Sequence, residues 1–217
     1  MLAFWLDPAA ALPIEHPRGH INIEEALARA RLGTERRVTR PLQGASLIIT
    51  DGGPSDWFAI EAHWGLVPPG TPREAMREAA SRNLVVRIDR ASGHPATSAL
   101  WQLVGAGEKT RRQCLVPVSG WIARGDRGLV AEKPEGGWAM LAAIYNTVQV
   151  NGKVITTFTI LISEWASTYR DGLHSMPVAI GSNRRTSWMH ALNPAGAIRW
   201  SKGGLEPVDR RRLRQRR

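Results

Sequence analysis

The chain has 217 residues, of which 43% are hydrophobic, and it carries a formal net charge of +10. This length and composition predict one globular domain with a sizeable core, and the basic excess favours a polyanionic partner such as nucleic acid. One cysteine excludes an internal disulfide and a cysteine zinc cluster, and no apolar run is long enough for a membrane span or a signal peptide.

Strands dominate the predicted structure. Apolar or alternating stretches between turn residues predict strands at 2–6, 46–50, 57–63, 84–89, 114–123, 128–132, 138–145, 147–150, 154–162 and 176–180. Asn151-Gly152 is a strong signal for a two-residue hairpin turn between two of them. Pro117 indicates a bent strand or one at a sheet edge, because proline cannot donate to a ladder. Cys114, in the same apolar run, is expected to be a buried and inert thiol.

Helices are predicted at 23–32, 72–82, 95–104, 164–171 and 185–192. Asn22 and Glu25 form a plausible capping box for the first helix. Thr71 is expected to cap the second, which has Pro72 at its first position. Many strands with peripheral helices predict an α+β protein built on a curved, barrel-like antiparallel or mixed sheet. We expect a single such domain over residues 1–200.

The C-terminal end is strongly basic. Residues 201–217 hold seven basic and two acidic residues, so this stretch carries a net charge of +5, half of the total excess. Such tails are usually disordered, and they add salt-sensitive, sequence-independent affinity for phosphates. We therefore predict nucleic-acid contacts from four arginines of the tail, which are Arg210, Arg211, Arg212 and Arg214.

Three apolar motifs in the chain share their order and spacing with a known family. They are His63-Trp64-Gly65-Leu66-Val67-Pro68-Pro69, Arg111-Arg112-Gln113-Cys114-Leu115-Val116-Pro117, and Thr157-Phe158-Thr159-Ile160-Leu161-Ile162 followed by Met176-Pro177-Val178. In this order they resemble the SRAP family (SOS response-associated peptidases), proteins that shield abasic sites in single-stranded DNA. The resemblance runs from about Trp57 to Ile180, and it implies the same barrel-like fold.

The resemblance also implies four reactive positions, and apolar residues stand at all of them. The family's N-terminal cysteine, whose amine and thiol condense with the abasic aldehyde, corresponds to Leu2. The family's asparagine corresponds to Val85, its glutamate to Ala123 and its histidine to Leu173. None of these side chains can transfer a proton. The resemblance therefore implies a member that lacks the family's covalent reaction.

Two polar neighbours of these positions leave alternatives open. His174 follows Leu173, and a one-residue deletion would bring its imidazole into the site. Asn83 precedes Val85 by two residues and would share its strand face, so a slip in register would restore the amide. A lone histidine in a loop is more often structural or solvated, and we regard both rescues as the weaker interpretation.

Other residues of the resemblance point to a surface that contacts DNA. Arg87 keeps the arginine of the family's Asn-Ala-Arg motif, and Trp64 beside Pro68, together with Trp121, offers aromatic rings to bases. Stacking of a base on such a ring contributes about 1–3 kcal/mol and tolerates any sequence. The alternative is that Arg87 pairs with a carboxylate and that Trp64 packs under its loop, and for Trp64 we favour packing.

The leading hypothesis is a cytoplasmic, non-catalytic SRAP-like protein of bacterial or phage origin that binds single-stranded or damaged DNA without a covalent bond. It would need no metal or cofactor and would have no membrane partner. One alternative is residual cross-linking or Schiff-base chemistry at abasic sites, with the Met1 amine as nucleophile and His174 as the acid–base group. Another is a phage structural or regulatory factor that binds a protein through the refilled pocket.

Overall fold

The structure, a computed structural model, describes residues 3–6, 14–16, 19–21, 25, 36–38, 41–42, 45–51, 57–91, 93–102, 112–125, 128–132, 138–163 and 176–190. The helices predicted at 23–32 and 164–171 lie outside these residues, apart from Glu25, and so does the tail at 201–217. Among the helices in these ranges, none is long and apolar enough to cross a membrane.

A long hairpin is the central element of the fold. Its strands, β11 (Ala139–Val150) and β12 (Lys153–Ser163), pair antiparallel on either side of Asn151-Gly152. Both turn residues have a positive φ, 51° at Asn151 and 73° at Gly152. A two-residue turn that follows the twist of its strands requires this conformation, which asparagine and glycine tolerate best. The hairpin predicted from Asn-Gly is confirmed.

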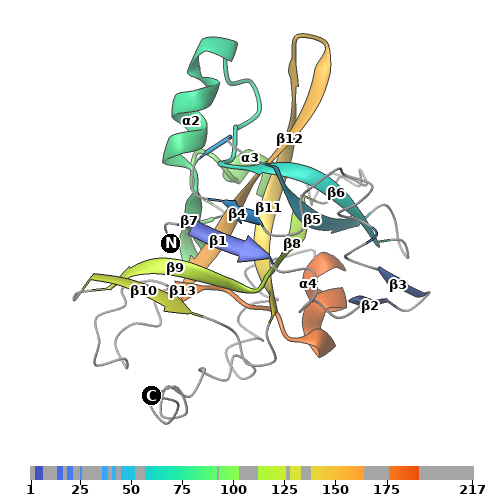
Figure 1. The fold of residues 1–217 in the computed structure, drawn as a ribbon. Coiled ribbons are helices and arrows are strands. Elements are labelled where there is room, and N and C mark those ends of the chain that lie inside the picture. The colour runs from blue at the N-terminus through green and yellow to red at the C-terminus, as the bar shows by residue number, and fades with distance from the viewer. Residues whose placement is uncertain are drawn as a thin grey trace.

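Three more strands close a barrel around this hairpin. They are β5 (Ala45–Asp51), β6 (Trp57–Trp64) and β8 (Gln113–Val118). The strands pair in the order β11-β8-β5-β6-β12, and β12 also pairs with β11, so the ring of five strands is closed (Figure 1). The β6–β12 pair is parallel and the others are antiparallel. The predicted α+β fold on a barrel-like mixed sheet is confirmed.

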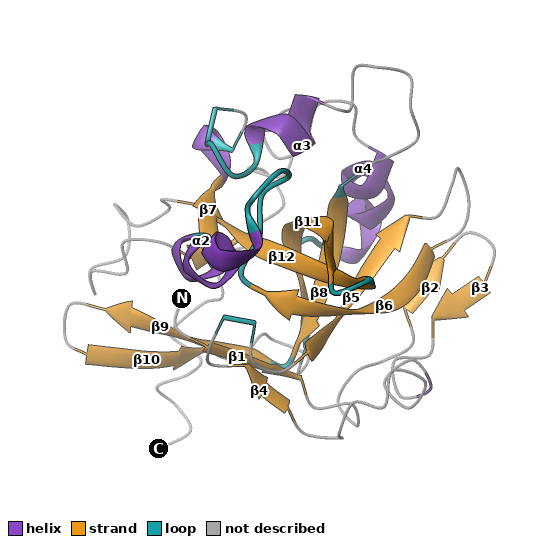
Figure 2. Ribbon diagram, turned by 90° about the horizontal axis from the view of Figure 1, so that it is seen from above, coloured by secondary structure: helices purple, strands orange, loops and turns teal. Residues whose placement is uncertain are grey.

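Shorter strands and helices surround the barrel (Figure 2). Two strands pair with the C-terminal half of β12, namely β7 (Val85–Arg87) and β13 (Met176–Pro177). A second sheet has four strands in the order β10-β9-β1-β4, which are β1 (Ala3–Leu6), β4 (Arg36–Val38), β9 (Gly120–Gly125) and β10 (Gly128–Glu132). A third, two-stranded sheet is formed by β2 (Ile14–His16) and β3 (Gly19–Ile21). The α-helices are α2 (Met76–Arg82), α3 (Ser98–Gln102) and α4 (Arg185–His190), with 3-10 turns at Arg73–Ala75, Ile88–Arg90 and Ser182–Arg184.

Side chains alternate between the two faces of each barrel strand, and as a result they form two separate cores. One cluster takes alternate residues of all five barrel strands together with Phe4 of β1, and it fills the barrel interior. We call this cluster the inner core. The other cluster combines the opposite strand faces with side chains of α3 and α4, such as Leu100 and Trp188, and it lies between the barrel and its helices. Strands buried on both faces explain why several segments are apolar without alternation.

Two predicted strand boundaries differ from the structure. The strand expected at 114–123 is divided at Ser119, whose N–H donates to Trp5 O at 2.7 Å, so β8 belongs to the barrel and β9 to the second sheet. The strands expected on either side of Asn146 are one continuous strand, because the amide of this buried asparagine finds an acceptor in Val67 O at 2.9 Å. β8 lies between β11 and β5, so Pro117 is not on an edge strand, but it lies beyond the β5–β8 ladder, which ends at Leu115, and pairs only with Met140 of β11.

Other predicted elements are shorter than expected. The helix predicted from residue 72 begins as a 3-10 turn without a side-chain cap, because the Thr71 hydroxyl donates instead to Pro68 O at 2.8 Å. The strand predicted at 84–89 ends at Arg87, where a 3-10 turn begins. Of the strand predicted at 176–180, only the first two residues form β13; the Val178 N–H still donates to Leu161 O of β12 at 2.9 Å, and Ala179 forms an isolated bridge with Leu141 of β11.

Candidate functional site

The strands that carry the family's motifs meet at the C-terminal end of β12. β7 pairs with β12 in parallel, with Val85 opposite Ile160 and Arg87 opposite Ile162. β13 approaches from the other side, with Pro177 opposite the same Ile162. β7 and β13, which are far apart in the sequence, therefore flank the same end of β12. This arrangement agrees with a site assembled from the motifs in the order that the resemblance implies.

The N-terminal strand reaches the region of the predicted glutamate position. In the second sheet Ala3 lies opposite Ile122, which directly precedes Ala123 in β9. The register of β1 and β9 is thus compatible with the closeness that a site shared by Leu2 and Ala123 would require. Leu2 and Leu173 lie outside the described residues, as does the alternative candidate His174, so a cluster of these positions remains a prediction.

Aromatic side chains fill the barrel interior next to β7. Phe4 is fully buried and meets two other rings edge-on, Trp64 at 5.3 Å and Phe158 at 6.2 Å between ring centroids. Trp121 belongs to the same inner core, and Val85 packs against it. The position that corresponds to the family's asparagine therefore borders hydrocarbon. Val85 is half-buried, so a carboxylate or amide at this position would lose part of its hydration.

The two tryptophans predicted to stack on bases are buried. Trp64 is 0% exposed, and its Nε1 donates to Leu84 O at 2.8 Å. Trp121 is 4% exposed, and among the described residues its Nε1 has no hydrogen-bond partner. Neither ring offers a free face to a base in this conformation. The geometry favours packing at both positions, as we expected for Trp64.

Gly65 lets the chain turn sharply after Trp64. Its φ is +106°, a conformation that residues with a Cβ rarely adopt, and a Cβ at this position would lie 2.7 Å from Ala80 O. The chain can therefore pass this close to α2 only with a glycine at position 65.

The loop that follows is held to α2 by Asn83. The Leu66 N–H donates to Asn83 O at 3.1 Å, and the Asn83 amide nitrogen donates to Leu66 O at 3.2 Å and to Ala79 O at 2.8 Å. The amide nitrogen has two hydrogens, and these two bonds use both. Asn83 therefore caps α2 and fixes the loop. The alternative in which it replaces the family's asparagine at position 85 is not supported by this geometry.

A second set of bonds holds the same loop to the hairpin. The Val67 N–H donates to Thr157 Oγ1 at 3.1 Å, and Asn146 Nδ2 donates to Val67 O at 2.9 Å. Thr157 Oγ1 also donates to Asn146 O at 3.4 Å. We call the bonds made by Asn83, Asn146 and Thr157 the loop clamp. The sequence offered one weak signal for it, namely polar residues at buried positions of otherwise apolar strands.

The loop clamp yields a test with a matched control, because Thr157 and Thr159 are both 0% exposed on the same face of β12. Thr157→Val leaves the Val67 N–H without an acceptor, so we expect the free energy of unfolding to fall by about 1–3 kcal/mol. Thr159 Oγ1 is buried without a partner among the described residues. We therefore expect Thr159→Val to be neutral or stabilising, by less than about 1 kcal/mol. Urea unfolding measures both, and equal losses would show that the Val67–Thr157 bond contributes nothing.

The remaining candidate residues lie on the surface or are engaged. Pro68 is half-buried and Pro69 exposed, in a turn closed by the Thr71 N–H, which donates to Pro68 O at 3.3 Å. Arg87 is half-buried and already interacts with another group. The four arginines predicted in the tail lie outside the described residues.

Thiol and metal chemistry find little support in the described part of the chain. Cys114 is 0% exposed, and burial raises the pKa of its thiol well above the usual value, so the unreactive thiol form persists at neutral pH. Within the same residues, no group of three or more His, Cys, Asp and Glu side chains lies close enough to hold a metal ion.

Comparison with known proteins identifies relatives of the whole barrel. The family model described as SOS response associated peptidase (SRAP) matches residues 30–215. A solved structure from Bordetella bronchiseptica is similar with a TM-score of 0.63 at 16% identity, covering 92% of each chain. A phage-related protein from the same organism has a TM-score of 0.58 at 14% identity, covering 92% of this chain and 86% of its own.

A third solved structure, from Bacteroides thetaiotaomicron, has a TM-score of 0.55 at 19% identity, covering 75% of this chain and 71% of its own. At these identities the likeness to solved structures shows the fold alone. No curated protein matches the chain.

Proposed function

The chain belongs to the SOS response associated peptidase (SRAP) family, whose model spans residues 30–215, and we propose that it binds single-stranded or damaged DNA without forming a covalent bond. Family membership supports a protein associated with DNA damage and abasic sites. The net charge of +10 supports a polyanionic ligand.

The packing of Val85 against the inner core carries the non-covalent part of this proposal. Opening and trapping an abasic sugar needs groups that move protons, and the side chain at this position is a half-buried hydrocarbon packed against an apolar cluster. Under the resemblance, Leu2, Ala123 and Leu173 are apolar as well, so the four replacements agree with one another as packing. The family model also begins at residue 30 and leaves out β1, the strand next to the family's cysteine position.

DNA would contact the surface beside the site at which apolar side chains replace the family's reactive residues. The exposed turn at Pro68 and Pro69 is held rigidly by the loop clamp, so it presents a fixed shape to a nucleic-acid strand. We assign Arg87 to the same surface because it lies on β7 beside the end of β12. The basic residues at 201–217 would add phosphate contacts without sequence preference.

A salt titration of DNA binding tests this function. We expect the affinity for a single-stranded oligonucleotide to fall steeply with salt, with a slope of log affinity against log salt of roughly −0.7 for each phosphate neutralised. Truncation after Gly204 removes Arg210 and the other arginines of the tail, so the slope should flatten. Fluorescence anisotropy at four or more salt concentrations measures both. An unchanged slope would remove the tail from the interface, and no binding at low salt would refute the proposed function.

A further inference from the structure

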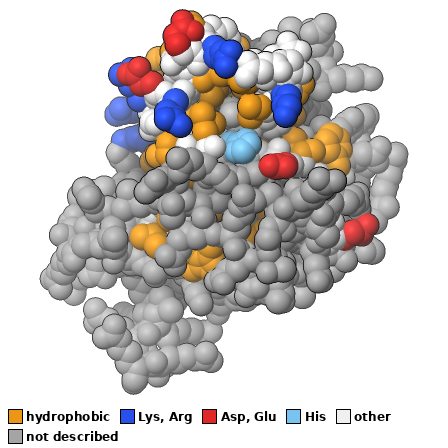
Figure 3. All heavy atoms as spheres, turned by 45° about the horizontal axis from the view of Figure 1, so that its top comes forward, with side chains coloured by type: hydrophobic (Ala, Val, Ile, Leu, Met, Phe, Trp, Pro, Cys, Tyr) orange, Lys and Arg blue, Asp and Glu red, His pale blue; other side chains and the backbone are white. Residues whose placement is uncertain are grey.

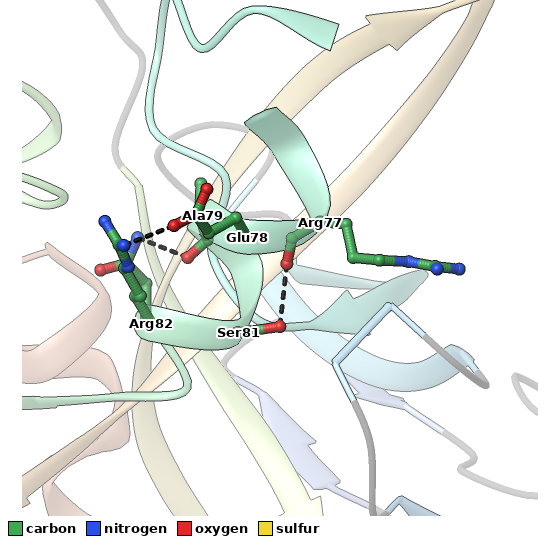
Figure 4. Close-up of polar contacts among 6 residues, drawn as sticks. Arg77, Glu78, Ala79, Ser81 and Arg82 are labelled. Carbon is green, nitrogen blue, oxygen red and sulfur yellow. Dashed lines mark hydrogen bonds and ion pairs between the residues drawn. The ribbon is translucent and has the colours of Figure 1, made fainter. Parts of the chain in front are cut away.

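Helix α2 separates its charges into a paired and an unpaired side. Glu78 and Arg82, one turn apart, form an ion pair. Figure 4 shows the Arg77 side chain pointing away from this pair. Ser81 Oγ donates to the backbone oxygen of Arg77 at 2.9 Å, a bond that leaves the Arg77 guanidinium unused.

Two arginines at the start of this region have no anionic partner in the part of the chain that the structure describes. Arg77 on α2 and Arg73 in the preceding 3-10 turn are exposed, and neither makes an ion pair with the residues that the structure describes. Glu78, which follows Arg77, is engaged by Arg82, and Glu74, three residues before Arg77, forms no ion pair among the described residues. The two guanidinium groups therefore remain available for an external anion.

These arginines follow directly on the rigid turn. Pro69 and Gly70 are exposed, and the loop clamp and the bonds of Thr71 to Pro68 O hold the chain on both sides of them. α2 and the β11–β12 hairpin project from the same side of the barrel (Figure 1). Figure 3 shows that basic side chains gather on this face, together with acidic ones.

We propose that Arg73 and Arg77 bind backbone phosphates of the DNA strand that passes over the turn at Pro69 and Gly70, an inference that rests on the proposed function. Guanidinium groups bind phosphate oxygens in a bidentate manner, and an unpaired arginine forms this contact without first breaking an ion pair. Arg82 would have to leave Glu78 to do the same. Phosphate contacts from α2 would therefore come from its unpaired side.

The experiment compares three glutamine substitutions on one short segment. For Arg73→Gln and Arg77→Gln, each alone and combined, we expect the salt slope for a single-stranded oligonucleotide to flatten by about 0.7 per lost phosphate contact, up to about 1.4 for the double variant. Arg82→Gln removes the same formal charge from the paired side, and we expect its slope to match the unmodified protein. Arg77→Lys should keep the slope while weakening binding, because lysine retains the charge and loses the bidentate geometry. Circular dichroism and thermal unfolding check that all variants fold alike.

The possible outcomes separate this inference from the proposed function. If the unmodified protein binds DNA and the double variant keeps its slope, α2 does not contact phosphates and only this inference fails. If Arg82→Gln flattens the slope as much as Arg77→Gln, the effect comes from net charge and the assignment to the unpaired side is overturned. If the unmodified protein does not bind DNA at any salt concentration, both proposals fail.

Discussion

Incubation with single-stranded DNA that contains an abasic site should give no adduct that survives heat and denaturant. The stable ring formed in the SRAP family needs the amine and thiol of one cysteine, and the resemblance places Leu2 at that position. The resemblance places Val85 at the position of the family's asparagine, so the amide is also absent. Positioned acid–base groups typically accelerate such steps by about 10²–10⁴-fold, and none stands at the positions that the resemblance assigns. Denaturing gel electrophoresis with labelled DNA measures the adduct.

Two controls make this result decisive. Leu2→Cys supplies a thiol at the family's position, and we expect it to restore a slow reaction at best, because nothing at Val85 or Ala123 assists sugar opening. Borohydride reduction traps any Schiff base, so it detects the alternative in which the Met1 amine reacts with help from His174. A rapid, heat-stable cross-link by the unmodified protein would overturn the non-covalent reading.

Gly65→Ala should be among the most destabilising substitutions in the described part of the chain. At this glycine an alanine would combine an unfavourable positive φ with a Cβ only 2.7 Å from the backbone oxygen of Ala80. The conformation alone costs about 1–2 kcal/mol, and relief of the overlap requires α2 or the loop to move. We therefore expect a total loss of at least about 3 kcal/mol in the free energy of unfolding, measured by urea denaturation.

Gly70 provides the matched control for this substitution. Its φ is +75°, and a Cβ built on it meets nothing within 4 Å. Gly70→Ala should therefore cost only the conformational part, about 1–2 kcal/mol. The difference between the two variants isolates the close approach of the loop to α2. Equal losses would mean that the loop relaxes without cost, and the loop clamp would then be less rigid than its hydrogen bonds imply.

Local sequence signals were sufficient for much of the fold. Asn151-Gly152 identified the hairpin because the turn type depends on two residues. The apolar strands were also predictable from local sequence, because burial of one or both strand faces leaves an apolar or alternating pattern within a few residues. Thr71 shows the limit of such signals, because an acceptor at Pro68 in the same turn displaced the expected helix cap.

The candidate site depends more on partners that are distant in the chain. Asn146 and Thr157 each bond Val67, and the latter pair is separated by 90 residues. The sequence does not show which strands the barrel brings together, so the loop clamp could not be derived from it. Trp64 was assigned two alternatives, stacking or packing, because its environment is set by residues distant in sequence, such as Phe4 in the first strand.

The closed barrel has a consequence for how the chain folds. β5 and β6 follow each other in the chain and form one hairpin, and β11 and β12 form another. Such local hairpins can form within microseconds. The seam between β6 and β12 is parallel and joins the most distant segments among the barrel pairings, so its closure carries the largest loss of chain entropy within the barrel. Until that seam forms, the aromatic lining around Trp64 faces water. A half-open barrel is thus the species in which this protein is most exposed to aggregation during synthesis.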